Sequence, residues 1–418
     1  MATRSNTMTA PSAPNYTIPF IAVTILFCIF GFLTNLNSNL SPKLEDIFNL
    51  SHAWSNTVAT AWFFAYLVFS VPSAKVIEAV GYKRTIVISL MVMVVGALLF
   101  VPAAHSVSFP LFLTASFVLA TGVCGLQTSA NPYVSILGPE HSAPARLTLA
   151  QAFNSLGTAL APIVVGVFIL TDPSKTATRE AVAHTVQGPY VAIACGLFLL
   201  GVAFMFMHLP AINAPTVPTS ADEPRSTTGR SIWSYRHTVL AMIGIFLYVG
   251  LEISLAANAI KFFNAQGVDN KDTAALLASF YPLSMMIGRF AGTFVMKVVK
   301  AEKLLVILGI LGVVLLVVCM ASTGQTAIWG LIVCGLANSI MYPTIFALGI
   351  AELGPMTSKG SGVITIGNVG GAVMPPLFGL VADWGHSYQF AFLLPMVGYL
   401  FVIFYGVSGY KPASKMAA

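Results

Sequence analysis

Residues 85–104 read TIVISLMVMVVGALLFVPAA, a run without a single charged side chain. An α-helix needs about 20 such residues to cross the hydrocarbon layer of a membrane. The rest of the chain has the same character: it has 418 residues, of which 57% are hydrophobic and 8% are charged, and its mean hydropathy is +0.84. Soluble domains carry about 25% charged residues. Lipid is therefore the solvent for most of this chain.

Further apolar stretches of this length lie on both sides of residues 85–104. The predicted spans are 18–40, 57–80, 85–104, 109–136, 146–171 and 187–208 in the first half and 238–263, 273–297, 303–321, 326–350, 358–382 and 388–408 in the second. The pattern predicts an all-α membrane protein of about twelve transmembrane helices in two six-helix halves.

A polar segment separates the two halves. Residues 214–230, APTVPTSADEPRSTTGR, are rich in Pro, Ser and Thr, which is typical of a solvated linker. The predicted organisation is a tail at 1–17, a first half at 18–209, a linker at 210–237, a second half at 238–408 and a tail at 409–418.

Lysine and arginine are distributed unequally between the two sides of the predicted membrane. With both termini inside, the inner side carries Arg4, Lys83, Arg84, Arg146, Arg225, Arg230, Arg236, Lys297, Lys300, Lys303, Lys359, Lys411 and Lys415. The outer side keeps Lys43, Lys175, Arg179 and Lys271, with Lys261 as a further candidate. Positive residues favour the cytoplasmic side. We therefore predict a multi-pass protein of the cytoplasmic (inner) membrane with tails and linker in the cytoplasm.

Two short sequence matches relate the halves. GLQTS at 125–129 resembles GLANS at 335–339, and GTALAPIVVG at 157–166 resembles GGAVMPPLFG at 370–379. Both matches join spans that are six apart. Repeated halves around a central site are a transporter architecture.

Amide and hydroxyl side chains concentrate in three predicted spans of the first half, with two more amides in the second half. Amides offer donors and acceptors that suit a ligand covered with hydroxyl groups. Hydrogen bonding between helices is the alternative role for each of them. The predicted substrate-binding residues are Asn35, Ser38, Gln127, Asn131, Gln151, Asn154, Asn258 and Asn338.

Glu252 lies midway through the seventh predicted span, whereas almost all other acidic residues lie in loops or at helix ends. A carboxylate at that depth is costly to keep ionised, so Glu252 is the candidate ion-coupling residue. A carboxylate satisfied by neighbouring donors, without a role in coupling, is the alternative. All histidines lie in loops or near helix ends, so the sequence indicates no histidine proton relay.

Charged residues between the second and third spans form a candidate conformational latch. Glu78 precedes a Gly turn that is followed by Lys83 and Arg84, and Arg289 occupies a related place in the second half. Basic residues at cytoplasmic helix ends are also ordinary in membrane proteins.

Motifs of other protein classes are absent from the sequence. It contains no Walker A loop, GxSxG elbow, HExxH or strand-linked GxGxxG, and its cysteines form no CxxC or Cys/His cluster. We therefore expect no enzyme, no metal site and no cofactor other than H+ or Na+ as a coupling ion. The absence of a basic run with interleaved aromatic residues argues against a nucleic-acid partner.

Several longer stretches carry a resemblance to a known family. They are FGFLTNLNSNLSP (30–42), GLQTSANPYVSILGP (125–139), RLTLAQAFNSLGTALAP (146–162), VQGPY (186–190), FLYVGLE (246–252), IGRFAGT (287–293) and YPTIFALGI (342–350). The chain resembles the major facilitator superfamily and, within it, the fucose–galactose–glucose:proton symporters of the L-fucose permease type. The stretches follow the family's order and cover both halves.

The resemblance implies twelve helices, alternating access and a central sugar site. The family's sugar-contacting positions fall on Asn35, Gln151 and Asn154. Its first-span aspartate falls on Ser38 and its fourth-span glutamate on Gln127, and neither replacement can titrate. The fucose-type proton pathway is therefore not available in this chain, which leaves Glu252.

We therefore predict a monomeric secondary transporter of a neutral monosaccharide or amino sugar, coupled to a cation through Glu252. No Lys or Arg lies clearly at mid-membrane, which favours a neutral substrate. An uncoupled facilitator and a transporter of another small organic solute are alternatives. A membrane sugar receptor is an alternative of another class, although the chain lacks an appended signalling domain.

Overall fold

The structure, a computed structural model, describes residues 16–48, 52–168, 179–207 and 231–412, and within them all side chains except those of 33–34, 36–59 and 162–186. All secondary structure in these ranges is helical. The predicted tails and linker lie outside the described residues, except for 16–17, 231–237 and 409–412.

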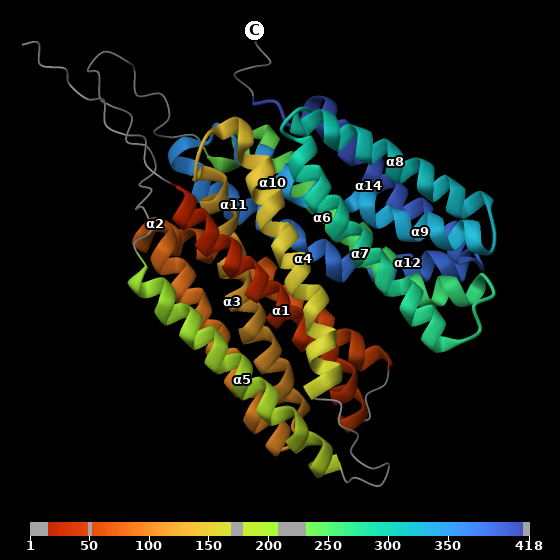
Figure 1. The fold of residues 1–418 in the computed structure, drawn as a ribbon, viewed down its shortest axis with the longest axis horizontal. Coiled ribbons are helices and arrows are strands. Elements are labelled where there is room, and N and C mark those ends of the chain that lie inside the picture. The colour runs from red at the N-terminus through yellow and green to blue at the C-terminus, as the bar shows by residue number, and fades with distance from the viewer. Residues whose placement is uncertain (1–15, 49–51, 169–178, 208–230, 413–418) are drawn as a thin grey trace, which may run out of the picture.

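The helices of the first half are drawn from red to yellow-green in Figure 1. They are α1 Thr17–Phe48, α2 His52–His105, α3 Phe109–Ile136, α4 Ala143–Phe168 and α5 Arg179–Phe206. α2 contains both predicted spans 57–80 and 85–104 and bends between them at Gly81, where φ is 83° and ψ is 167°. Glycine adopts this φ without steric cost. α2 therefore crosses the bundle twice.

The second half, green to blue in Figure 1, has three continuous helices and three broken passes. The continuous helices are α6 Arg236–Ala265, α7 Lys271–Val295 and α8 Ala301–Ala321. The broken passes are α9 Gln325–Asn338 with α10 Met341–Gly349, α11 Thr357–Ile366 with η4 Gly367–Val369 and α12 Gly370–Trp384, and α13 Tyr388–Ala391 with α14 Leu393–Phe404 and η5 Tyr405–Gly409.

The predicted number of passes is confirmed. The first half supplies α1, the two arms of α2, α3, α4 and α5, and the second supplies three continuous and three broken passes. Among the described residues, nine helices or broken helices are long and apolar enough to cross a membrane, with the two arms of α2 counted as one.

α8 shows how one helix faces lipid and bundle at once. Ile307, Ile310, Val314 and Val317 are exposed, and they recur at three- and four-residue spacing on one face. Leu316 is fully buried. An exposed isoleucine stripe in water would be an aggregation hazard, but in lipid it is the expected surface.

The repeated motif marks two close helix crossings. A Cβ built on Gly157 of α4 would lie 1.9 Å from the Cys28 carbonyl oxygen of α1, and one built on Gly370 of α12 would lie 1.9 Å from the Phe246 carbonyl oxygen of α6. Each glycine therefore lets a helix approach the first helix of its own half. The sequence repeat reflects the same contact made twice.

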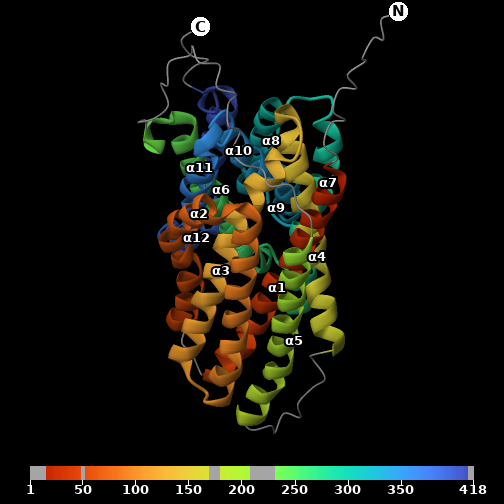
Figure 2. The ribbon, with the colours of Figure 1, turned by 90° about the vertical axis from the view of Figure 1, so that its left-hand side faces the viewer.

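We call the end of the bundle where α1 begins and η5 ends the terminal face, and it is uppermost in Figure 2. Because successive passes alternate in direction, this face also carries the Gly81 bend, the turn between α3 and α4, and the turn between α10 and α11. The opposite end is the far face.

Candidate substrate and coupling site

Two amides of the predicted substrate-binding set lie where α1 crosses α4. Asn35 Nδ2 donates a hydrogen bond to the Thr158 carbonyl at 2.6 Å, and Asn154 Nδ2 donates to the Phe27 carbonyl at 3.0 Å. Both side chains are half-buried. In this state their amide nitrogens join two helices of one half. Ser38 belongs to α1, but its side chain lies outside the described part of the structure.

Helices α3 and α11 bring the two halves together near the centre. The Ser361 hydroxyl donates to the Thr128 carbonyl at 2.6 Å. Asn131 of α3 is fully buried, and its Nδ2 lies 3.5 Å from the Tyr342 hydroxyl of α10. These contacts place the fourth predicted span against the tenth and eleventh.

Three polar oxygens beside these contacts lack hydrogen-bond partners among the described residues. They are Oε1 of Gln127, Oδ1 of Asn131 and Oγ1 of Thr365, and all three are buried. Buried polar groups without a partner are uncommon and call for an explanation. A ligand rich in hydroxyl groups, or ordered water, would supply the missing donors.

Gln151 and Asn258 are two further members of the predicted set. Gln151 of α4 is 7% exposed and Asn258 of α6 is 9% exposed. Asn258 Nδ2 donates to the Ser254 carbonyl of its own helix at 2.9 Å. The backbone carbonyl of Gln151 accepts a hydrogen bond from the other half, at Arg289.

Arg289 of α7 joins the two halves through its guanidinium group. Its Nε donates to the Ser339 carbonyl at 3.1 Å, and its Nη1 donates to the Gln151 carbonyl at 3.2 Å and to the Ser155 hydroxyl. The Ser339 carbonyl is available because Pro343, four residues later, has no N–H to donate to it. The break between α9 and α10 thus leaves a backbone carbonyl free to accept a hydrogen bond from Arg289.

Glu252 lies in α6 beside the same guanidinium. The charge of its carboxylate interacts with that of the Arg289 guanidinium, although the two side chains form no ion pair within 4 Å. The Tyr248 hydroxyl, one turn earlier in α6, donates to the Asn338 carbonyl. Glu252 therefore lies near Arg289, where the second half faces α4, without contacting it.

The candidate latch residue Arg289 is buried inside the bundle. α7 continues to Val295, so Arg289 is nearly two turns inside the helix rather than at its end, and it is only 7% exposed. Its guanidinium is satisfied by hydrogen bonds to Ser339, Gln151 and Ser155, as a buried cation requires.

Asn338 belongs to a tyrosine cluster inside the second half. Its Nδ2 donates to the Tyr281 hydroxyl at 2.7 Å, and its Oδ1 accepts from the Tyr399 hydroxyl at 2.8 Å. Its backbone carbonyl accepts from the Tyr248 hydroxyl at 3.0 Å. The side chain therefore ties α7 and α14 to α9, and it supports the helices that carry Glu252 and Arg289.

We expect Asn338→Ala and Asn131→Ala to differ in their effects. Asn338→Ala removes the partner of two buried hydroxyls, so it should lower the free energy of unfolding by about 2–4 kcal/mol. Asn131→Ala removes an oxygen that already lacks a partner, so stability should change by less than about 1 kcal/mol while the KM for sugar rises. Thermal unfolding in detergent and uptake kinetics measure both. A stable Asn338→Ala protein with a raised KM would reverse this assignment.

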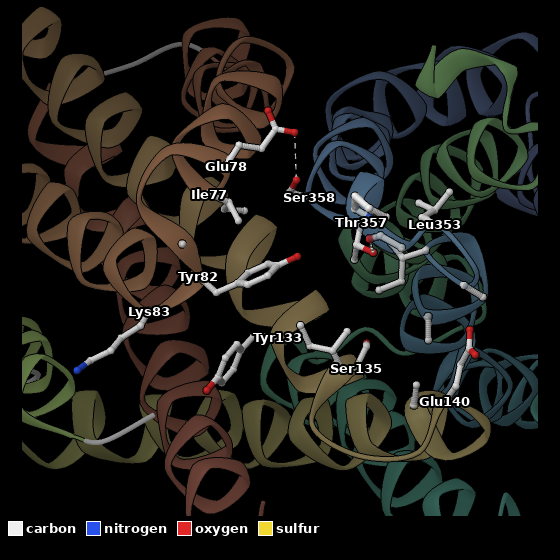
Figure 3. Close-up of a pocket in the computed structure, with 18 of the residues that line it drawn as sticks. Ile77, Glu78, Tyr82, Lys83, Tyr133, Ser135, Glu140, Leu353, Thr357 and Ser358 are labelled. Carbon is white, nitrogen blue, oxygen red and sulfur yellow. Dashed lines mark hydrogen bonds between the residues drawn. The ribbon is translucent and has the colours of Figure 1, made fainter. Parts of the chain in front are cut away.

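Of the candidate latch residues at the terminal face, Glu78 contacts the other half. Its carboxylate accepts a hydrogen bond from the Ser358 hydroxyl at 3.3 Å (Figure 3) and lies 3.7 Å from Lys359 Nζ. The ion-pair partners are partly exposed, so the pair contributes at most about 1 kcal/mol. Lys83 instead donates to the Met205 carbonyl at 2.9 Å within its own half, and Arg84 is exposed.

Sequence reasoning missed a second cross-half contact at this face. Glu140, in the turn between α3 and α4, accepts a hydrogen bond from the Glu352 backbone N–H at 3.2 Å. Glu352 has a φ of 57°, which is unusual for a residue with a side chain. In the sequence, this contact was indicated only by the acidic residue that directly follows the NPYVSILGP motif. Its partner lies 212 positions later and could not be deduced from the sequence.

A cavity of about 1140 Å³ opens beside these contacts. Residues of both halves line it, including Glu78, Tyr82, Glu140 and Ser358, whose arrangement is visible in Figure 3. None of the predicted substrate-binding residues is among those that line it. The cavity is therefore a pocket at the terminal face and not the central polar site.

The sequence matches the Major Facilitator Superfamily over residues 22–366. The chain belongs to this superfamily. It is 40% identical to a glucose/galactose transporter of Brucella abortus over 96% of both chains, and 30% identical to the L-fucose-proton symporter of Escherichia coli over 92% of both. A crystal structure of the transporter FucP in the outward conformation covers 94% of this chain and 98% of that one, with 28% identity and a TM-score of 0.84. This superfamily member is a secondary transporter and not an enzyme.

Proposed function

We propose that this protein is a symporter of a neutral hexose, of the glucose or galactose type, driven by a cation that binds at Glu252. The observation that supports this most directly is the combination of one central carboxylate with unpartnered amide and hydroxyl oxygens at the interface of the halves. The substrate class follows from the Brucella abortus relative, a glucose/galactose transporter that is 40% identical over nearly the whole chain.

The polar side chains of the central site suit a neutral ligand. Gln127, Asn131 and Thr365 offer acceptors to sugar hydroxyls, and the guanidinium of Arg289 is already occupied by hydrogen bonds to Ser339, Gln151 and Ser155. An anionic substrate would need an unpaired cation in the site. We further propose that the protein works as a monomer in the inner membrane with its terminal face in the cytoplasm, as the distribution of Lys and Arg favours.

We assign coupling to Glu252 because neutral residues stand where the fucose symporters have their two titratable acids. Ser38 and Gln127 cannot titrate, and Glu252 is the acidic side chain that lies midway along a membrane-length helix in the described residues. The oxygens of this carboxylate can bind either H+ or Na+, because hard cations favour oxygen ligands. An uncoupled facilitator is the second candidate, because a carboxylate held permanently by Arg289 would bind no ion.

The test is uptake of radiolabelled D-glucose, D-galactose and L-fucose into proteoliposomes under a proton gradient, a sodium gradient or neither. We expect glucose or galactose to accumulate under one gradient and to equilibrate without it. An ionophore that collapses the gradient is the control. Equilibration under all three conditions would identify the facilitator, and accumulation of L-fucose alone would reject the hexose assignment.

A further inference from the structure

His237 lies in the first turn of α6 at the terminal face, and the proposed function does not use it. Its side chain is 1% exposed, and its Nε2 lies 3.0 Å from the Ala351 carbonyl oxygen. A carbonyl oxygen only accepts, so Nε2 carries a hydrogen and donates it. In the neutral imidazole the bare nitrogen is therefore Nδ1, which is buried without a hydrogen-bond partner among the described residues.

The hydrogen bond from His237 helps to fix the turn between α10 and α11. The next residue, Thr238, donates from its hydroxyl to the Gly349 carbonyl at 2.9 Å. α10 ends at Gly349, and the last carbonyls of a helix need donors from outside the helix. Two successive side chains of α6 thus hold the end of α10 and the turn that follows it.

The same turn carries a contact between the halves. Glu352 directly follows Ala351, and its backbone N–H donates to the Glu140 carboxylate of the first half at 3.2 Å. The φ of Glu352 is 57°, a conformation that costs energy for a residue with a side chain and persists where its surroundings hold it. The bond from His237 fixes the carbonyl directly before Glu352. The position of the imidazole therefore affects how the terminal face closes.

We infer that His237 is a pH-sensitive switch, in which protonation of the imidazole releases the α10–α11 turn from α6 and weakens closure of the terminal face. This regulation is separate from ion coupling at Glu252 and acts on the same closure from its edge. With the terminal face in the cytoplasm, as proposed above, the switch responds to cytoplasmic pH.

The closed arrangement disfavours the protonated imidazole. Protonation adds a hydrogen at Nδ1 and a positive charge, and that nitrogen has no acceptor among the described residues. The bond from Nε2 is already made in the neutral form, so protonation strengthens it without adding a new one. A buried charge is costly unless water or a partner reaches it. Release of the turn lets water reach the imidazole, so the open arrangement binds the proton more readily.

The neighbouring titratable groups do not reverse this preference. The Glu352 carboxylate attracts a charged imidazole, but its side chain is exposed and water screens the attraction. The Tyr235 ring lies 6.2 Å from the imidazole between centroids, and the Tyr405 hydroxyl donates to the His237 carbonyl at 3.4 Å. Both tyrosines are uncharged near neutral pH. Since the closed arrangement binds the proton less readily, closure weakens as the pH falls below about 6.5.

The test measures the separation of the halves at the terminal face as a function of pH. Arg84 of the first half and Lys300 of the second are exposed at this face. Spin labels would be placed at Arg84→Cys and Lys300→Cys after the five native cysteines are replaced by alanine. Glu252→Gln is present throughout, so the central carboxylate does not titrate. We expect pulsed EPR distances in detergent to show that the ratio of open to closed protein rises about fivefold between about pH 8 and about pH 5.5.

Three variants assign the response to His237. His237→Gln keeps an N–H donor for the Ala351 carbonyl but cannot be protonated, so its ratio should change by less than about twofold. His141→Gln is the matched control, because His141 is an exposed histidine next to Glu140 at the same face, and this variant should keep the full response. His237→Arg is permanently charged and should be open already at about pH 8. If His237→Arg does not fold, the two glutamine variants still decide.

The inference is overturned by a pH response of full size in His237→Gln. It is also overturned if the protein with His237 intact does not respond, or closes further as the pH falls. None of these results bears on the proposed function, because every sample carries Glu252→Gln. Gradient-driven sugar uptake by the protein with Glu252 intact tests that function separately.

Discussion

Glu252→Gln should abolish gradient-driven accumulation of sugar while sugar exchange across the membrane continues. One pH unit is worth about 1.4 kcal/mol per proton and a potential of 100 mV about 2.3 kcal/mol per charge. Together they drive one-to-one symport to a concentration ratio of about 500. Without a group that binds the cation, the ratio falls to about 1, because sugar binding by neutral amides is unaffected by the gradient.

The measurement is steady-state accumulation in proteoliposomes beside counterflow of labelled sugar. Asp383→Asn is the matched control, because Asp383 is an exposed carboxylate near the end of α12 and should retain full accumulation. If Glu252→Gln also accumulates sugar several-hundred-fold, another group couples the ion. Loss of counterflow together with accumulation would show that the variant no longer binds sugar or changes conformation.

Gly157→Ala and Gly370→Ala should each destabilise the protein, although alanine is the better helix former. The added Cβ would lie 1.9 Å from a carbonyl oxygen of the crossing helix, at Cys28 or Phe246. Backbone atoms cannot rotate aside, so the helices must separate. We expect a cost of about 3 kcal/mol, which lowers the thermal unfolding midpoint by about 5 °C or more.

Two other glycines test the same substitution without the clash. A Cβ at Gly379 of α12 or Gly196 of α5 would have no neighbouring atom within 4 Å. Alanine is favoured over glycine in a helix by about 1 kcal/mol, so these variants should keep or gain stability. Equal loss at all four positions would mean that glycine serves backbone flexibility rather than close packing.

The cross-half contacts explain why the structure is closed at its terminal face. Among the described side chains, hydrogen bonds between the halves run from Glu78 and Glu140 at that face to Arg289 nearer the centre. The ion pair at Glu78 is partly exposed, whereas the contact at Arg289 is buried.

The sequence by itself determined the fold. A run of about 20 apolar residues crosses lipid as a helix, because a helix makes all its backbone hydrogen bonds within the segment. The sequence repeat predicted two related halves. The span predicted at 109–136 has the bounds of α3, although the run through Gly81 became one bent helix and three passes of the second half are broken. Glu252 was also evident from sequence, because a carboxylate at mid-span is rare.

Only the tertiary structure decided which polar residues act together. The amides of Asn131 and Asn338 look alike in sequence, yet one has an unpartnered oxygen at the interface and the other is held by tyrosines. The burial of Arg289 and its contacts with the other half were likewise not evident from sequence, because periodicity gives the face of a residue and not its partners. Its partners lie 134 to 138 residues away on α4, and contacts at that separation depend on how the halves pack.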